Sequence, residues 1–494
     1  MSARGAKAAA LAIAASALMS PIPAAAKVSL SASPGLKPSF QLGVPDYVSR
    51  CKPGAPLRFS VSASGGDTVS IAGQPKRGGD FTVPVMRATG EEVTVAVTAN
   101  GRRSTHHVRC LPRDFPGWST HRHGKPEAQW YVLTPIGPNK RGYVAVFDAR
   151  GVPLWWMFSS AWGPWDGKLL SNGNLAWTRQ FNDLIGLDPN EAWEEHRLDG
   201  STVRILKTVG SPTDFHDLEQ TPDGHFLLDT YRPRSDVDLS AYGLPKHANV
   251  YDGVIQELAA DGTLVWSWSS KDHIDLSEIR PAWWDHVKRG QRKKPKDERA
   301  YDLVHVNSVE PDGNGYIVSF RFLDAVYRID RRTGAIDWKL GGTKRPESLK
   351  VKKDPLGSAP FSGQHDARLW TDRTLTVFDN GTKADRRPRV VRYRIDRKKR
   401  TATLVEGFDE GDEPYSGALG SARKLPGGNW VVGWGGTTLT TERTPSGKRV
   451  FDLRFSGDMH SYRSFPIPHG RLTAQQLRQG MNAVARSGAA GAAR

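Results

Sequence analysis

The stretch HVNSVEPDGNGYIVSFRFLDAVYRIDRRTGAIDWKLGG, residues 305–342, contains two consecutive hairpins. In each hairpin, two runs rich in β-branched and aromatic residues flank a tight turn, at Asp312–Gly313 and around Gly334. Such turn residues between apolar runs are a strong short-range signal of a β-hairpin. Two hairpins in succession predict a four-stranded antiparallel sheet of the kind that forms a propeller blade.

The second hairpin of this stretch recurs along the chain, with an aromatic residue four positions after the turn glycine. Four copies carry this pair, at Gly151 and Trp155, Gly262 and Trp266, Gly334 and Trp338, and Gly447 and Phe451. Two weaker copies lie at residues 194–206 and 390–405, and a hairpin of the first kind precedes five of the six. Six units at a period of roughly 50 to 60 residues predict a six-bladed β-propeller over residues 128–467.

The first blade lacks a complete hairpin of the first kind. QWYVLTP, residues 129–135, and SYRSFPIP, residues 461–468, are the candidates to supply it. Pairing of these distant segments would close the ring of blades and remove its open edges. Residues 269–304 break the period and predict a partly helical insertion between two blades.

The residues before the propeller predict a second, smaller β domain. Residues 28–113 alternate polar and apolar positions between Gly-rich turns, which predicts a small antiparallel β-sandwich. The fold class is therefore all-β, a propeller preceded by a sandwich. Cys51 and Cys110 are the only cysteines, and we expect a disulfide between them, with two buried free thiols as the alternative. After about residue 472 we expect a short helix followed by disorder, so that residues 473–494 form a tail.

The N-terminus predicts export. Residues 1–26 combine Arg4 and Lys7, an apolar run over residues 8–19 and the small residues Ala24–Ala26, which is typical of a cleaved signal peptide. A run of about a dozen residues is too short for a membrane anchor, which needs about 20. No later segment is long and apolar enough to span a membrane. The mature protein is expected to be secreted, periplasmic or in the cell envelope.

The net charge of +17 narrows the class of ligand. Nucleic acid is not expected as a partner, because export and the absence of a nucleic-acid-binding motif argue against it. A positive field also attracts anionic small molecules.

Three histidines share one position in the repeat. His216, His305 and His365 each stand seven residues before the turn aspartate of a first hairpin. Trp165 and Gly420 occupy the corresponding position in two other hairpins. Because the first strand of each blade lines the central channel, we expect the three histidines to converge at one mouth of it.

Such a cluster is compatible with three kinds of site. Histidines bind Zn, Cu or Fe, act as nucleophiles or acid–base groups on an anion, or make structural hydrogen bonds across the channel. Asn307 should share a strand face with His305, and Arg321 lies on the next strand. The arginine fork suits sulfate or phosphate oxygens and would repel a cation. We therefore expect an anion site without a resident metal or cofactor.

Residues 305–342 resemble the core signature of bacterial arylsulfotransferases. GQHDARLW, residues 363–370, with LTVFDNG, residues 375–381, is similar to the region of that family's sulfate-accepting histidine; residues 215–224 and 421–435 also match. The resemblance covers about residues 128–467. It implies a six-bladed propeller with an N-terminal β-sandwich that moves a sulfuryl group from a phenolic sulfate ester to a phenol. No nucleotide sulfate donor takes part, and the group is carried on a sulfohistidine.

Carried over by motif, the resemblance makes His365 the nucleophile. His216, His305, Asn307 and Arg321 would hold the sulfuryl oxygens. The chain departs from the family's pattern at two places. Phe322 follows Arg321, where bacterial members often carry another histidine. The cysteine pair that the best-known members have near the active site has no counterpart here.

Two other functions remain open at this point. One is a non-catalytic exported propeller that binds an anionic or aromatic ligand, and the other is a metal-dependent propeller lyase. The expected partners are an aryl sulfate and a phenol, and the sequence does not predict an oligomeric state.

Overall fold

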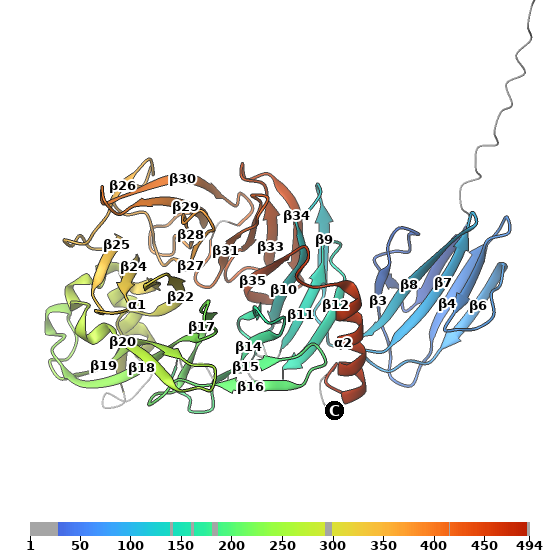
Figure 1. The fold of residues 1–494 in the computed structure, drawn as a ribbon, viewed down its shortest axis with the longest axis horizontal. Helices are drawn as coiled ribbons and strands as arrows, with labels where there is room; N and C mark the ends of the chain where they lie inside the picture. Colours follow the sequence, from blue (N-terminus) through green and yellow to red (C-terminus); the bar gives the residue numbers. More distant parts are fainter. Residues whose placement is uncertain are drawn as a thin grey trace, which may run out of the picture.

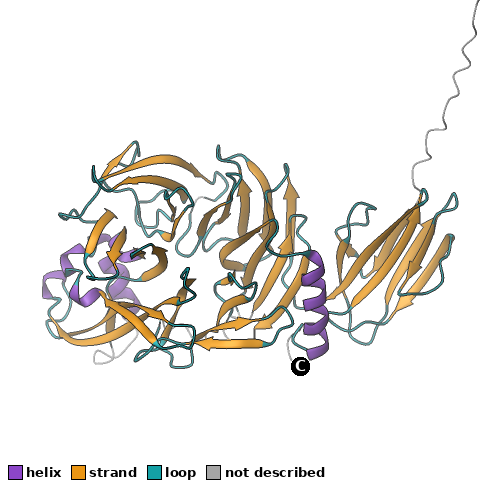
Figure 2. Cartoon of the chain, in the orientation of Figure 1, coloured by secondary structure: helices purple, strands orange, loops and turns teal. Residues whose placement is uncertain are grey.

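The computed structural model describes residues 28–138, 142–159, 163–179, 186–291, 299–413 and 415–491. Residues 1–26, the predicted signal peptide, lie outside these ranges. The described chain forms two β domains with a helix, α2, between them (Figure 1). Strands dominate both domains, as Figure 2 shows, and no helix of the described residues is long and apolar enough to cross a membrane.

The N-terminal domain consists of two sheets that share one core. The first sheet has the order β1 (Val28–Ser33), β4 (Leu57–Ala63), β6 (Gly79–Val85). The second has the order β2 (Leu36–Lys37), β3 (Asp46–Arg50), β8 (Arg102–Leu111), β7 (Glu92–Ala99), β5 (Thr68–Ile71). Alternate residues of β4 are buried, including Phe59, which packs with Val95 of the other sheet. β3 and β8 run parallel, so the expectation of a purely antiparallel domain is wrong. A disulfide joins Cys51 and Cys110, as predicted.

The larger domain contains six sheets, each with four antiparallel strands, which we call blades one to six. Blade one has the order β12 (Pro153–Ser159), β11 (Gly142–Asp148), β10 (Ala128–Ile136), β35 (His460–Pro468). Blade two contains β13 (Gly167–Leu169), β14 (Leu175–Arg179), β15 (Ala192–His196) and β16 (Thr202–Leu206). Blade three contains β17 (Thr213–Gln220), β18 (Phe226–Val237), β19 (Ala248–Leu258) and β20 (Leu264–Ser269).

The other three blades follow the same order. Blade four contains β22 (Val306–Asp312), β23 (Gly315–Phe320), β24 (Ala325–Asp330) and β25 (Ile336–Gly341). Blade five contains β27 (His365–Leu369), β28 (Leu375–Asp379), β29 (Arg389–Asp396) and β30 (Thr401–Asp409). Blade six contains β31 (Ser421–Lys424), β32 (Trp430–Gly433), β33 (Leu439–Arg443) and β34 (Arg449–Phe455). The predicted propeller is therefore present, and its blades surround a common centre (Figure 1).

The ring is closed by the pairing that the sequence suggested. β35 pairs antiparallel with β10, with Val132 opposite Phe465. Three short strands extend other blades: β9 (Trp118–Arg122) pairs with β34, β21 (Ala300–Asp302) with β19, and β26 (Lys350–Lys352) with β30.

The insertion between blades three and four is partly helical, as predicted. It contains α1 (Pro281–Gln291), which buries Trp283, Trp284 and Val287. Its other helical parts are the short 3₁₀ turns Ser270–Asp272 and Leu276–Glu278.

The short helix expected after residue 472 is present, but it packs on the propeller and is not part of a disordered tail. α2 (Ala474–Ser487) begins at a capping box formed by Thr473 and Gln476. It buries Leu477, Met481 and Val484 in the core of blade one, and these apolar positions at i, i+4 and i+7 form one helix face.

Candidate functional site

The innermost strands of the blades are joined by hydrogen bonds at one level of the channel. Val309 N–H donates to Asp217 Oδ2 (2.8 Å), Ala367 N–H to Ser308 Oγ (3.0 Å), Ala422 N–H to Asp366 Oδ2 (3.2 Å), and Ser464 N–H to Ser421 Oγ (3.0 Å). The acceptors are therefore equivalent positions on successive blades. Asp166 and Arg463 hold the same position in the other two blades. The residues that directly precede these six positions form the next level of the channel: Trp165, His216, Asn307, His365, Gly420 and Tyr462.

This register corrects the alignment made on the turn aspartates. In blade four the position equivalent to His216 and His365 is Asn307, not His305. The misalignment arises because the turns differ in length. In blade four, Asp312 pairs with Gly315, so it ends β22 and only two residues form the turn. In blade five, Leu369 pairs with Leu375 across a longer turn.

His305 still lies in the histidine cluster, although it does not hold the equivalent strand position. It lies just before β22 with a left-handed backbone, φ +54°, which is uncommon for a residue other than glycine. Its ring centroid is 4.8 Å from that of His216, and it stacks on Phe322 at 4.7 Å. Strand alternation therefore does not explain how His305 and Asn307 come together.

His365 is held in one tautomer. Its Nδ1 lies 2.7 Å from Asn380 Oδ1 and 3.0 Å from Gly363 O. Both are acceptors, so Nδ1 carries the hydrogen. Nε2 is left with its lone pair, and it accepts from the Leu419 N–H at 3.2 Å. Burial, with Arg321 nearby, holds the pKa of His365 well below its usual value, so the imidazole is neutral.

His216 and His305 are each backed by a carboxyl group. Nδ1 of His216 is hydrogen-bonded to Asp214 Oδ2, and Nδ1 of His305 lies 2.6 Å from Asp302 Oδ2. Burial lowers the pKa of His216 to about 4 and that of His305 well below its usual value. Both rings are therefore neutral near pH 7 and offer their Nε2 atoms to the site.

Arg321 and Asn307 present unused polar atoms. Arg321 Nη2 donates to Gly417 O at 2.6 Å, whereas its buried Nε has no partner among the described residues. The Asn307 amide donates to Gln364 O at 2.7 Å, and its buried Oδ1 is likewise without a partner in the described chain. Burial lowers the pKa of Arg321 only to about 10, so its guanidinium keeps its charge. A buried cation with an unused donor suits an anionic ligand.

The segment 415–420 covers these groups. Besides the contacts of Gly417 and Leu419, Asn380 Nδ2 donates to Ser416 Oγ and to Leu419 O, both at 3.0 Å. Thr382 Oγ1 donates to Gly417 O at 3.2 Å. Backbone atoms of this segment thus occupy a hydrogen-bonding position on both His365 and Arg321.

An aromatic wall lies beside His216. Phe215 stacks on the His216 ring at 4.3 Å and packs against Trp165 at 5.3 Å. Tyr462 completes the wall at 6.3 Å from Trp165, and its buried hydroxyl has no partner among the residues described. Such a surface suits the ring of an aromatic ligand.

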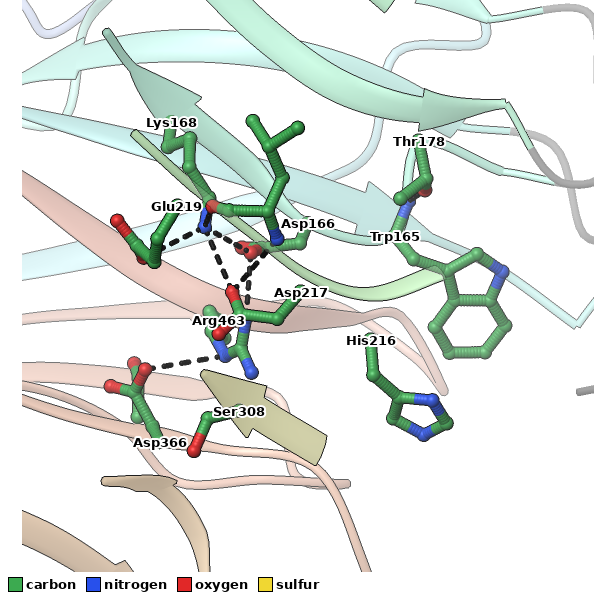
Figure 3. Close-up of polar contacts among 12 residues, drawn as sticks. Trp165, Asp166, Lys168, Thr178, His216, Asp217, Glu219, Ser308, Asp366 and Arg463 are labelled. Carbon is green, nitrogen blue, oxygen red and sulfur yellow. Dashed lines mark hydrogen bonds and ion pairs between the residues drawn. The ribbon is translucent and has the colours of Figure 1, made fainter. Parts of the chain in front are cut away.

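A buried ion network closes the channel beneath the site (Figure 3). Lys168 and Arg463 both contact Asp166 and Asp217, at 2.6 to 3.1 Å. The members of the network are Asp166, Lys168, Asp217, Glu219, Glu310, Asp366, Arg368, Arg423 and Arg463. Asp217 and Asp366, which follow two of the histidines, therefore have a structural role as members of this network.

Several residues of the site were not found from the sequence. Asp214, Asp302 and Asn380, which orient the three histidines, lie off the repeat position that singled the histidines out. His286 comes from α1 and packs against Phe322 at 5.5 Å, next to the position where bacterial relatives often carry a histidine. The Asp-x-His spacing at Asp214 was the one available signal.

Within the described part of the chain, two groups of side chains have the composition of a metal site. Ligand atoms of Asp214, His216 and Asp229, all buried, lie within 4.8 Å of one another, as do those of Asp223, His225 and Glu257. In the first group, Nδ1 of His216 is engaged in a hydrogen bond with Asp214, so it does not present a lone pair to a metal ion. In the second, Arg331 Nε donates to Glu257 Oε2 at 2.6 Å and supplies the positive charge there.

Fold and site together define a β-propeller with a buried cluster of histidine, arginine and asparagine side chains at one mouth of its channel. The sequence profile of the family described as Arylsulfotransferase (ASST) matches residues 187–456. This match spans more than half of the chain and includes all three histidines. The chain belongs to the arylsulfotransferase family.

Other comparisons give distant likenesses. No curated protein matches the chain. A protein of unknown function from Bacteroides caccae is 12% identical with a TM-score of 0.40, over 69% of this chain and 99% of that one. Virginiamycin B lyase from Staphylococcus aureus is 11% identical with a TM-score of 0.33, over 73% and 90%. The Dos1 propeller is 12% identical with a TM-score of 0.30, over 68% and 85%.

Proposed function

We propose that the protein transfers a sulfuryl group from a phenolic sulfate ester to a phenol, with His365 carrying the group as a sulfohistidine. The observation that carries this proposal is the tautomer of His365. Its Nδ1–H is anchored by Gly363 O and Asn380 Oδ1, and a neutral ring leaves Nε2 as a nucleophile.

The reaction is a double displacement. Nε2 of His365 bonds to sulfur while the sulfur–oxygen bond to the aryl group breaks, and the phenolate leaves with the electron pair. The oxygen of the acceptor phenol then bonds to sulfur, and the electron pair of the nitrogen–sulfur bond returns to Nε2. By analogy with phosphoryl transfer, catalysis consists mainly of positioning and charge stabilisation.

The surrounding groups suit a sulfuryl oxyanion. Arg321 supplies positive charge and a free Nε donor, and Asn307 contributes a neutral amide. His216 and His305 are neutral and act through hydrogen bonds rather than through charge. The wall of Phe215 and Trp165 suits the aryl ring. The substrate must displace the Leu419 N–H from Nε2, so we expect the segment 415–420 to move when substrate binds.

The direct test is rapid quenching after mixing with ³⁵S-labelled 4-nitrophenyl sulfate, followed by peptide mapping under alkaline conditions. We expect label on the peptide that contains His365, and none in His365→Ala. His225→Ala, in a turn of blade three, is the matched control and should label normally. Phenol release without label on this peptide would exclude the nucleophile. No release from any aryl sulfate would instead favour the ligand-binding propeller.

We also propose that the protein is exported, with residues 1–26 removed. The disulfide between Cys51 and Cys110 supports this, because such bonds persist in oxidising compartments. N-terminal sequencing of protein recovered outside the cytoplasm should begin at Lys27. Accumulation of the full-length chain in the cytoplasm would contradict export.

A further inference from the structure

Two carboxyl groups of blade three lie in contact behind His216. Asp214 precedes the histidine by two residues on β17, and Asp229 lies on the neighbouring strand β18. One carboxyl oxygen of each lies within 4.8 Å of the other and of a ring nitrogen of His216. Asp214 Oδ2 is also bonded to Nδ1 of His216, and Asp229 Oδ1 accepts from the Asp217 N–H at 3.1 Å.

The remaining oxygen of each carboxyl group is unsatisfied. Asp214 Oδ1 and Asp229 Oδ2 are buried and have no hydrogen-bond partner among the described residues. Two ionised carboxylates in contact would repel, so at least one of them holds a proton. Burial raises the pKa of Asp214 to about 7 and that of Asp229 well above its usual value.

The charged and titratable groups around this pair do not neutralise it. The groups that face Asp214, Asp229 and His216 from neighbouring elements are Glu191, Asp217, Tyr231, Asp302, His305, Arg321, Tyr462 and Arg463. Arg463 is bound to Asp166 and Asp217, and Arg321 faces Gly417. Neither forms an ion pair with Asp214 or Asp229, so a shared proton is the means of neutralising these two.

We propose that the Asp214–Asp229 pair is the proton reservoir of the transfer cycle, acting through His216. This inference rests on the proposed function. In the first displacement the leaving phenolate takes the proton from Nε2 of His216. The proton of Asp214 Oδ2 moves to Nδ1, and Asp214 becomes a carboxylate that accepts hydrogen bonds from Nδ1–H and from the Asp229 carboxyl.

The second displacement reverses these transfers. The acceptor phenol gives its proton to Nε2 of His216, the Nδ1 proton returns to Asp214, and the phenol oxygen takes the sulfuryl group from His365. Between the two half-reactions the protein therefore lacks one proton, and the Asp229 O–H stabilises the negative charge left on Asp214. Asp214 and Asp229 are positioning residues, because neither touches the substrate.

His216 is better placed for this task than His305. The aromatic wall of Phe215, Trp165 and Tyr462 adjoins His216, so an aryl ring on this wall brings its oxygen toward Nε2. His305 stacks on Phe322. Its carboxyl partner Asp302 has no second carboxyl in hydrogen-bond contact among the described residues.

The test compares leaving groups, which a purely structural role would not distinguish. 4-Nitrophenolate leaves readily without a proton, whereas phenol has a pKa near that of tyrosine, about 10, and its anion needs one. Asp214→Asn should slow phenol release from phenyl sulfate about a hundredfold, in the range of acid–base catalysis. With 4-nitrophenyl sulfate we expect only a few-fold loss. Equal losses on both substrates would overturn the proposal.

Asp229 gives a graded check. Asp229→Asn can still donate a hydrogen bond to Asp214, so it should retain more phenyl sulfate turnover than Asp229→Ala. His225→Ala is the control and should leave the ratio of the two substrates unchanged. Equal losses of phenyl sulfate turnover in Asp229→Asn and Asp229→Ala would show that a hydrogen bond from residue 229 to Asp214 does not support the transfer.

A spectroscopic measurement does not depend on turnover. The infrared difference spectrum of wild type against Asp229→Asn at pH 7 should contain the band of a protonated carboxyl group. Absence of this band would overturn the proposal, as would a divalent cation found by elemental analysis in wild type and missing in the variant. A wild type that forms no sulfohistidine would contradict the proposed function itself, whereas sulfohistidine without these effects would contradict only the proton reservoir.

Discussion

At the scale of single residues, the three histidines differ in what holds them. Asn380, a neutral amide, orients His365, whereas carboxyl groups orient His216 and His305. A carboxylate behind an imidazole makes the ring a stronger base, and an amide does not. His365 thus remains neutral, as the proposed nucleophile must be, while the proposed proton transfer uses a ring that has a carboxyl partner.

Substitutions of Arg321 test whether the site holds an anionic group. Arg321→Ala should lower turnover of 4-nitrophenyl sulfate about a hundredfold or more, because one preorganised charged donor is lost from a buried site. Arg321→Lys should recover little of this, since an ammonium group cannot reproduce both the Nη2 and the Nε donor. Initial rates of the three proteins decide the matter. Full activity of the lysine variant would mean that charge alone suffices.

The pH dependence of stability tests the proton on Asp229. Burial raises the pKa of this carboxyl well above its usual value, so the folded protein holds a proton that the unfolded chain releases. The stability from this proton is fully present below about pH 4, the unfolded pKa, and is lost as the pH rises toward the folded pKa. Asp229→Asn has no such proton to lose.

We therefore expect the variant to gain about 2–4 kcal/mol relative to wild type between pH 4 and pH 7. Urea unfolding at both pH values measures the difference, with the exposed Asp385→Asn as the control. A difference that does not change with pH would show that Asp229 is ionised in the folded protein.

The sequence predicted part of this site. The repeat position found His216 and His365, because turns of equal length mark equivalent residues. It misaligned blade four by two residues, because the two-residue turn after Asp312 is shorter. The roles of Asp214 and Asn380 could not be predicted, since they depend on contacts between a loop or strand end and a neighbouring strand.

At the scale of elements, the hairpins were predictable because four of the six copies carry their own turn glycine and aromatic residue. Trp155, Trp338 and Phe451 are buried at corresponding places between strands, so a local pattern reports a tertiary position. The short helix α2 was expected, but its packing on the propeller was not, because the alanine- and glycine-rich residues that follow it resemble a disordered tail. What orders it is a surface on blade one that no local pattern describes.

α2 gives the prediction at this scale. Leu477 is fully buried against blade one, so Leu477→Ala should reduce the free energy of unfolding by about 2–4 kcal/mol. Gln475→Ala, on the exposed face of the same helix, is the matched control and should change little. Urea unfolding followed by tryptophan fluorescence measures both. Equal stability of the two variants would mean that the helix is not docked in solution.

At the scale of the whole molecule, α2 joins the two domains. Arg478 binds Asp46 of the sandwich through two contacts of 2.7 Å, and Arg109 of the sandwich donates to Asn482 at 2.8 Å. The apolar face of the same helix packs on blade one. The sandwich is therefore held by a helix that belongs to the far end of the propeller sequence.

The disulfide should act on one domain only. Cys51 and Cys110 are 59 residues apart and both lie in the sandwich core, so removing the bond should cost about 4 kcal/mol through the entropy of the unfolded chain. We expect the double variant Cys51→Ser, Cys110→Ser to unfold its sandwich at lower urea concentration while 4-nitrophenyl sulfate turnover is retained. Loss of turnover in the folded variant would show that the sandwich supports the site.

Because β35 closes the ring, its synthesis determines when the site can assemble. β35 follows every other propeller strand along the chain, and it brings Tyr462 and Arg463 into the channel. Before it arrives, β10 has an open edge, and Asp166 and Asp217 lack the Arg463 contacts of 2.6 and 3.0 Å. A growing chain is made from its N-terminus, so His216, His305 and His365 are synthesised long before they can be organised. The histidine cluster and the ion network beside it are therefore complete only when synthesis has passed the closing strand.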